Sequence, residues 1–130
     1  MPRQQFDEVS LINRSAGFGG SDTPGTYLDI VTVQPGDARI DSLVVWNFDS
    51  ISHIVDVRLY DGVAQQFQGS ATLAAGDGVG NLGSFTDLIA AFRSGVQAFI
   101  SLPAGQRLQF TVAEGTVDAG VTINAQGGGF

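Results

Sequence analysis

The chain has 130 residues and a formal net charge of −7, from 13 acidic and 6 basic side chains. Hydrophobic residues make up 43% of it, which is the composition of one folded domain and excludes a disordered chain. The basic residues are all arginine and are scattered along the chain, which argues against binding to nucleic acid or to an anionic membrane. The chain has no cysteine, so disulfides, thiolate metal sites and a cysteine nucleophile are excluded.

The first 25 residues are predicted to form an N-terminal arm. Phe6–Ile12 has the pattern of a short strand, and Ser15–Gly25 is a glycine-rich linker. An ordinary edge strand followed by a long loop explains the same residues equally well. We expect two units, an arm over residues 1–25 and a β-sandwich domain over residues 26–130.

The rest of the chain carries closely spaced strand patterns separated by turn residues. The predicted strands are Thr26–Val33, Arg39–Phe48, His53–Tyr60, Ala64–Leu73, Val96–Leu102, Arg107–Ala113 and Val117–Ala125. This spacing predicts an all-β fold, an antiparallel β-sandwich or jelly roll. Arg39–Phe48 and His53–Tyr60 are predicted to pair as a hairpin across a loop of about four residues.

One short helix is predicted at about residues 85–94. Ser84 is placed to cap its N-terminus, with Asp87 three residues later, and Gly95 is placed to end it. The apolar residues Phe85, Leu88, Ile89 and Phe92 recur with the spacing of one helical face. We expect this helix to close one end of the sandwich.

Alternation of apolar and polar residues predicts which side chains face the core. Leu108, Phe110 and Val112 share one face of their strand, with Arg107, Gln109 and Thr111 on a solvated face. In the predicted strands Arg39–Phe48 and His53–Tyr60, by contrast, both faces carry apolar residues. Ile40, Val44, Trp46 and Phe48 are predicted to share the core face, which leaves Leu43 and Val45 on the outer one. Similarly, Val55, Val57 and Leu59 are predicted to face the core, with Ile54 and Tyr60 outside.

Large apolar side chains left in water each lose about 1.5–3 kcal/mol of burial, so we expect the outer face to be covered. Either the N-terminal arm or the helix of the same chain covers it, or another subunit does. The interface candidates are Phe6, Val9, Leu11 and Ile12 of the arm, with Leu43, Val45, Ile54 and Tyr60 of the outer face.

Candidate chemistry is sparse. His53 lies near Asp49, Ser50, Ser52 and Asp56, but adjacent strand residues point to opposite faces, so Ser52 and His53 do not form a catalytic pair. We expect a solvated histidine, no catalytic residue, no metal ligand and no cofactor. The glycine-rich segment 74–84 lacks the pattern of a phosphate loop, and a weak calcium site at Asp77 stays open.

Two stretches resemble small β-sandwich structural proteins of tailed bacteriophages. They are "VVWNFDSISHIVDVRLYDG" (Val44–Gly62) and "ISLPAGQRLQFTVAEGTVDAGVTINAQG" (Ile100–Gly127). The resemblance implies a virion structural protein without catalytic residues, of the type that decorates and stabilises the assembled capsid. It implies homo-oligomers, often trimers, that contact the major capsid protein or another virion protein.

The remaining observations are consistent with this expectation. Low charge suits a surface shared with neighbouring subunits, and the N-terminus lacks the apolar segment of a secretory signal, as expected for assembly in a host cytoplasm. We therefore expect a protein of the virion surface that binds neither nucleic acid nor membrane. A phage tail or fibre protein, or another carbohydrate-binding jelly-roll module, is the alternative.

Overall fold

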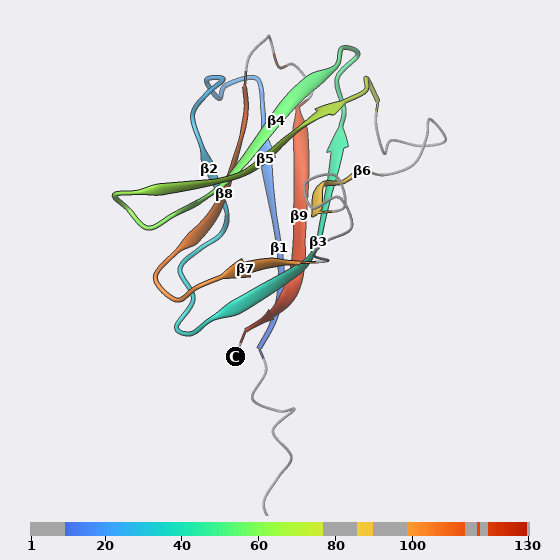
Figure 1. The fold of residues 1–130 in the computed structure, drawn as a ribbon. Helices are drawn as coiled ribbons and strands as arrows, with labels where there is room; N and C mark the ends of the chain where they lie inside the picture. The colour runs from blue at the N-terminus through green and yellow to red at the C-terminus, as the bar shows by residue number, and fades with distance from the viewer. Residues whose placement is uncertain (1–9, 77–85, 90–98, 114–116, 118–119, 130) are drawn as a thin grey trace, which may run out of the picture.

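The computed structural model describes residues 10–76, 86–89, 99–113, 117 and 120–129 (Figure 1). In chain order the strands are β1 (Ser10–Phe18), β2 (Leu28–Val31), β3 (Ala38–Asn47), β4 (His53–Tyr60), β5 (Gln65–Leu73), β6 (Thr86–Asp87), β7 (Ile100–Leu102), β8 (Arg107–Val112) and β9 (Val121–Gly129).

The strands form two antiparallel sheets that pack face to face, which confirms the predicted all-β sandwich. Sheet A has the order β1-β9-β3-β6, with β7 pairing a different part of β3. Sheet B has the order β2-β8-β4-β5. The first and last strands lie side by side in sheet A, since β1 pairs with β9 over its whole length (Figure 1).

The predicted hairpin between Arg39–Phe48 and His53–Tyr60, which correspond to β3 and β4, is wrong. β3 belongs to sheet A and pairs with β9, whereas β4 belongs to sheet B and pairs with β8 and β5. The short connection after Asn47 therefore crosses from one sheet to the other. The hairpin of this region is β4–β5, whose turn is closed by a hydrogen bond from the Asp61 N–H to the carbonyl oxygen of Ala64.

The core fills the space between the two sheets. Sheet B contributes the alternating residues that the sequence predicts: Val55, Val57 and Leu59 from β4, and Leu108, Phe110 and Val112 from β8, all buried. Phe18 of β1 meets Phe110 across the core, edge to face, with ring centroids 6.3 Å apart. The regular alternation of β4 and β8 is the reason that their faces could be predicted.

A β-bulge in β3 reverses the predicted faces of that strand. Ile40 pairs with Gly127 and Ser42 with Gln126, so Asp41 is an extra residue without a partner in the register. Beyond the bulge the alternation shifts by one position. Leu43 and Val45 consequently point into the core and are fully buried, while Val44 and Trp46 are only partly buried. The assignment of Leu43 and Val45 to an outer face is therefore wrong.

Gly127 makes the bulge sterically possible. A Cβ atom at this position would lie 1.8 Å from the carbonyl oxygen of Arg39 and 2.9 Å from the Cα of Ile40. Both neighbours are backbone atoms that cannot rotate away. This position must lack a side chain, because only then can β9 and β3 approach each other.

Of the predicted arm the structure describes residues 10–25, and Ser10–Phe18 belong to sheet A, so the prediction of a linker is wrong for Ser15–Phe18. Ser10–Phe18 form edge strand β1, which is the second of the two alternatives for this region, and Gly25 donates a hydrogen bond to the carbonyl oxygen of Val112 in sheet B. Phe6 and Val9 lie outside the described residues.

Most of the predicted helix also lies outside the described residues. Within the described part, the helix prediction is wrong for Thr86 and Asp87, which form β6 and pair with β3, while Leu88 and Ile89 are buried in the core. An Asp87 side-chain oxygen accepts a hydrogen bond from the Ile89 N–H, at 3.1 Å, which is the bonding pattern of a helix N-cap.

Candidate functional site

The predicted interface residues do not form one surface. Leu11 is 87% exposed on β1, but its neighbour Ile12 is buried in the core. Ile54 is 37% exposed on the outer face of sheet B, and Tyr60 is partly exposed on the same face. With Leu43 and Val45 in the core, only Leu11, Ile54 and Tyr60 of the described candidates are accessible to a partner.

Two exposed apolar residues near Ile54 were not among the candidates. Phe48 and Ile51 lie in the connection that crosses between the sheets, and their side chains are 47% and 50% exposed. Phe48 is exposed because the bulge in β3 reverses its face. In the sequence, the only indication of this bulge is Asp41, a charged residue within an otherwise apolar strand.

His53 is buried, which contradicts the expectation of a solvated histidine. Its Nε2 atom lies 2.6 Å from a carboxylate oxygen of Asp49, and both side chains are almost inaccessible to solvent. The other ring nitrogen, Nδ1, is buried and has no hydrogen-bond partner among the residues that the structure describes. A buried polar pair costs free energy unless it is bonded, and Asp49 supplies that bond.

The Asp49 carboxylate and backbone also join three segments of chain at this end of the sandwich. The carboxylate accepts a hydrogen bond from the Gly120 N–H at 3.1 Å, and the Asp49 carbonyl oxygen accepts one from the Gly76 N–H. Asn47 donates its side-chain N–H groups to the carbonyl oxygens of Ile51 and Ala74. Since the side chains of Asn47, Asp49 and His53 are all buried, this arrangement favours a structural role over catalysis.

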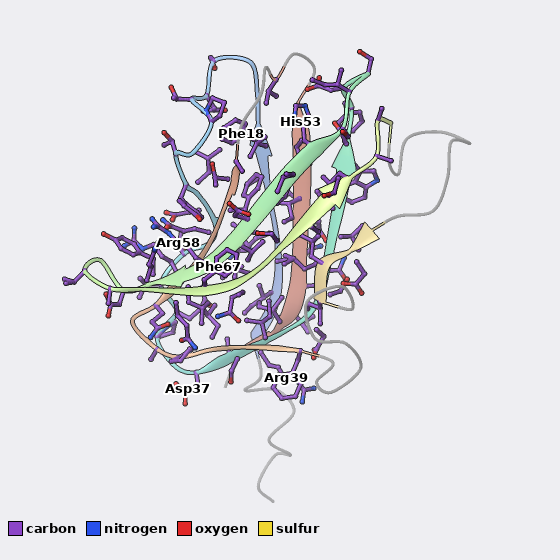
Figure 2. The ribbon with its side chains drawn as sticks, turned by 45° about the horizontal axis from the view of Figure 1, so that its top comes forward. Phe18, Asp37, Arg39, His53, Arg58 and Phe67 are labelled. Atoms are coloured by element: carbon purple, nitrogen blue, oxygen red, sulfur yellow. The ribbon has the colours of Figure 1, made fainter. Side chains whose placement is uncertain are left out.

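The outer face of sheet B carries a cluster of polar and aromatic side chains. The guanidinium carbon of Arg58 lies 3.8 Å from the ring centroid of Tyr27 and 4.4 Å from that of Tyr60, so the cation contacts both aromatic rings. Phe67 lies directly across from Arg58 on the neighbouring strand and is 58% exposed (Figure 2). We call Tyr27, Arg58, Tyr60 and Phe67 the aromatic patch.

Hydrogen bonds hold Arg58 in place. Its Nε–H donates to the side-chain oxygen of Gln109 at 2.9 Å, and an Nη1–H donates to that of Gln65 at 2.5 Å. The amide nitrogen of Gln109 donates in turn to Asp29 at 2.7 Å. Residues on β2, β4, β5 and β8 therefore contribute to one network across the whole width of sheet B.

This network also explains a departure from the expected solvated face of β8. Gln109 and Thr111 are buried although they point away from the core. The Thr111 hydroxyl accepts a hydrogen bond from the Gly25 N–H, because the segment before β2 lies against it.

Burial, and next the Asp56 carboxylate, raise the pKa of Tyr27 above its usual value, with Arg58 acting in the opposite direction.

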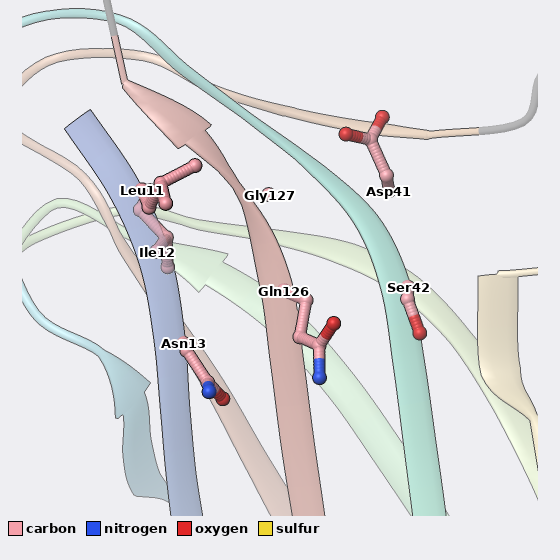
Figure 3. Close-up of a pocket in the computed structure, with 7 residues that line it drawn as sticks. All are labelled: Leu11, Ile12, Asn13, Asp41, Ser42, Gln126 and Gly127. Carbon is pink, nitrogen blue, oxygen red and sulfur yellow. The ribbon is translucent and has the colours of Figure 1, made fainter. Parts of the chain in front are cut away.

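A shallow hollow of about 370 Å³ lies on the outer face of sheet A (Figure 3). It forms where the bulge of β3 meets the glycine of β9. The lining residues are Leu11, Ile12, Asn13, Asp41, Ser42, Gln126 and Gly127. It is open, and its polar groups come from strand surfaces without a common chemical character, so its geometry indicates no particular ligand.

Among the described residues, no group of three or more histidine, cysteine, aspartate or glutamate side chains is placed to hold a metal ion. Asp77, the candidate calcium ligand, lies outside them. In the described part of the chain, no helix is long and apolar enough to span a membrane. Comparisons with protein-family models, curated proteins and solved structures found no match.

Proposed function

We propose that the chain is a virion structural protein, a homo-oligomeric decoration protein that binds and stabilises an assembled phage head. Its support is the resemblance of Val44–Gly62 and Ile100–Gly127 to phage sandwich proteins, together with the β-sandwich fold that such proteins adopt. The observation that carries the proposal is the exposed edge of β5, which is suited to pairing with another chain.

β5 lacks most of the protection that edge strands normally have. Within the described residues no strand pairs with its outer edge, and its sequence, QQFQGSATL, contains no charge and no proline. A bulge at Gln68 interrupts it, but Gly69–Leu73 beyond the bulge is regular. Unpaired edge strands of this kind are templates for pairing between chains, and soluble proteins normally block them.

The other edges of the two sheets are blunted. β1 carries Arg14, and β2 has only four residues and includes Asp29. At the β3 edge of sheet A, β6 has only two residues and β7 only three. The contrast makes β5 the preferred edge for strand addition. The exposed side chain of Ile54 lies near its Leu73 end, because Ile54 pairs with Thr72.

Decoration stabilises a shell by mass action. A protein that binds only the assembled form shifts the equilibrium toward that form. Because a head offers many equivalent sites, an oligomer that reaches several of them holds on more tightly than one contact would allow. This function needs complementary surfaces and no catalytic group.

Light scattering after size-exclusion chromatography tests the oligomeric part of the proposal. The unmodified chain is expected to form oligomers at micromolar concentration, and Thr72→Lys, which puts a charge on the exposed edge of β5, is expected to shift it toward monomer. Thr32→Lys is the matched control, since it adds the same charge at an exposed position after β2. Equal masses for the two variants would contradict pairing through β5.

A further inference from the structure

We propose that the outer face of sheet B is a binding site for neutral oligosaccharide, centred on the aromatic patch. This inference goes beyond the proposed function and does not rest on it, because a sugar-binding face can belong to a head, a tail or an unrelated protein. It is carried by the side chains that four strands bring together around Arg58.

The aromatic side chains supply the apolar component of such a site. Phe67 leaves more than half of its surface in water, which is unfavourable for a phenyl ring unless something covers it. Tyr27 and Tyr60 are each partly exposed, and both rings contact the Arg58 guanidinium. The C–H face of a pyranose ring is an apolar surface of suitable size to lie against such rings.

The polar side chains supply fixed donors and acceptors. Bonds to Gln109 and Gln65 engage two of the five N–H donors of Arg58. These bonds and the two tyrosine rings restrict its rotation, so little side-chain entropy is lost when a ligand binds. Asp29 adds carboxylate oxygens on the same network. Sugar hydroxyls both donate and accept, so they can use both kinds of group.

The charges on this face favour a neutral ligand. Arg58 and Arg107 are balanced by Asp29, which lies 3.7 Å from Arg107, and by Asp56, which is bonded to Ser70. The face is thus neutral on a chain whose net charge is −7. An acidic polymer would be repelled by the chain as a whole without a compensating positive patch here.

The test is a nuclear magnetic resonance titration of the full chain with neutral oligosaccharides of glucose, galactose and N-acetylglucosamine, and with an acidic oligogalacturonate. We expect at least one neutral oligosaccharide to shift the backbone amides of Arg58, Phe67 and Gln109 at concentrations up to about 10 mM. Phe67→Ala should weaken that binding about tenfold, because it removes the most exposed ring.

Two further variants keep the test decisive. Phe48→Ala removes a ring of similar exposure outside the patch and should leave binding unchanged. Arg58→Gln should abolish binding while the amide spectrum of the core strands is retained. The proposal is overturned if no neutral oligosaccharide shifts these amides, if Phe67→Ala and Phe48→Ala behave alike, or if the acidic oligosaccharide binds better. Each readout is independent of the oligomeric state that Thr72→Lys reports.

Discussion

Replacing Gly127 by alanine is predicted to destabilise the protein strongly. The new Cβ atom would lie 1.8 Å from the Arg39 carbonyl oxygen, 2.8 Å from the Arg39 carbonyl carbon and 2.9 Å from the Ile40 Cα. All three are backbone atoms of the paired strand, so relief requires β3 and β9 to separate at the bulge. Overpacking of this kind costs about 1–3 kcal/mol and occasionally more, and a clash with backbone belongs at the upper end.

Chemical denaturation followed by circular dichroism measures this loss. Gly17→Ala is the control, since it is the same substitution in β1 of the same sheet and its Cβ would meet only the Thr122 hydroxyl, at 3.8 Å. For a domain of this size, about 3 kcal/mol lowers the melting temperature by roughly 10 °C. Similar stabilities of the two variants would refute both the bulge and the face assignment of β3 that depends on it.

Two predictions concern the connections at the ends of the sandwich. Asp49→Ala should reduce the free energy of unfolding by about 3–5 kcal/mol, because it leaves the buried His53 ring and the Gly120 N–H without their acceptor. Denaturation curves of the two proteins would measure this loss. In the β4–β5 turn, hydrogen bonds from the backbone N–H groups of Ala64 and Val63 hold the pKa of Asp61 below its usual value. The stabilisation from this turn should therefore be present above the unfolded-state pKa of about 3.9 and be lost as the pH falls through the lower folded-state pKa. The backbone amide chemical shifts of Val63 and Ala64, recorded as a function of pH, would follow this loss.

Each of these predictions has its own control. Ser50→Ala changes an exposed neighbour of Asp49 and should have little effect on stability, so an equal loss for both variants would count against the buried pair. Asp61→Asn retains an oxygen that can accept the two backbone bonds but does not titrate in this range. If the amides of Val63 and Ala64 in Asp61→Asn shift at low pH as they do in the unmodified chain, Asp61 does not cause the pH dependence.

The core could be predicted where strands are regular. β4 and β8 alternate without interruption, so the inward positions of Val57 and Phe110 followed from period-two spacing alone. β3 carries one extra residue, and a single insertion reverses every later side chain. The bulge depends on Gly127, which is distant in sequence, so local alternation could not reveal it.

The candidate site was predictable only in part for the same reason. The outward positions of Arg58 and Tyr60 followed from alternation, whereas Tyr27 and Phe67 reach them through strand pairing that the sequence does not specify. His53 was expected to be solvated because its short-range neighbours are polar. Its burial depends on Asp49, which also accepts the N–H of Gly120 from the opposite end of the chain.

Binding to phage heads tests the central claim most directly. The purified chain would be mixed with undecorated heads, and separately with tails, of the tailed phage that the proposed function requires as its source, and bound protein would be measured after sedimentation. The account predicts saturable binding to heads, a raised temperature of head disruption, and weaker binding by Thr72→Lys than by Thr32→Lys. Binding to tails alone would favour the tail or fibre alternative. A chain that stays monomeric at micromolar concentration and binds neither structure would contradict the account.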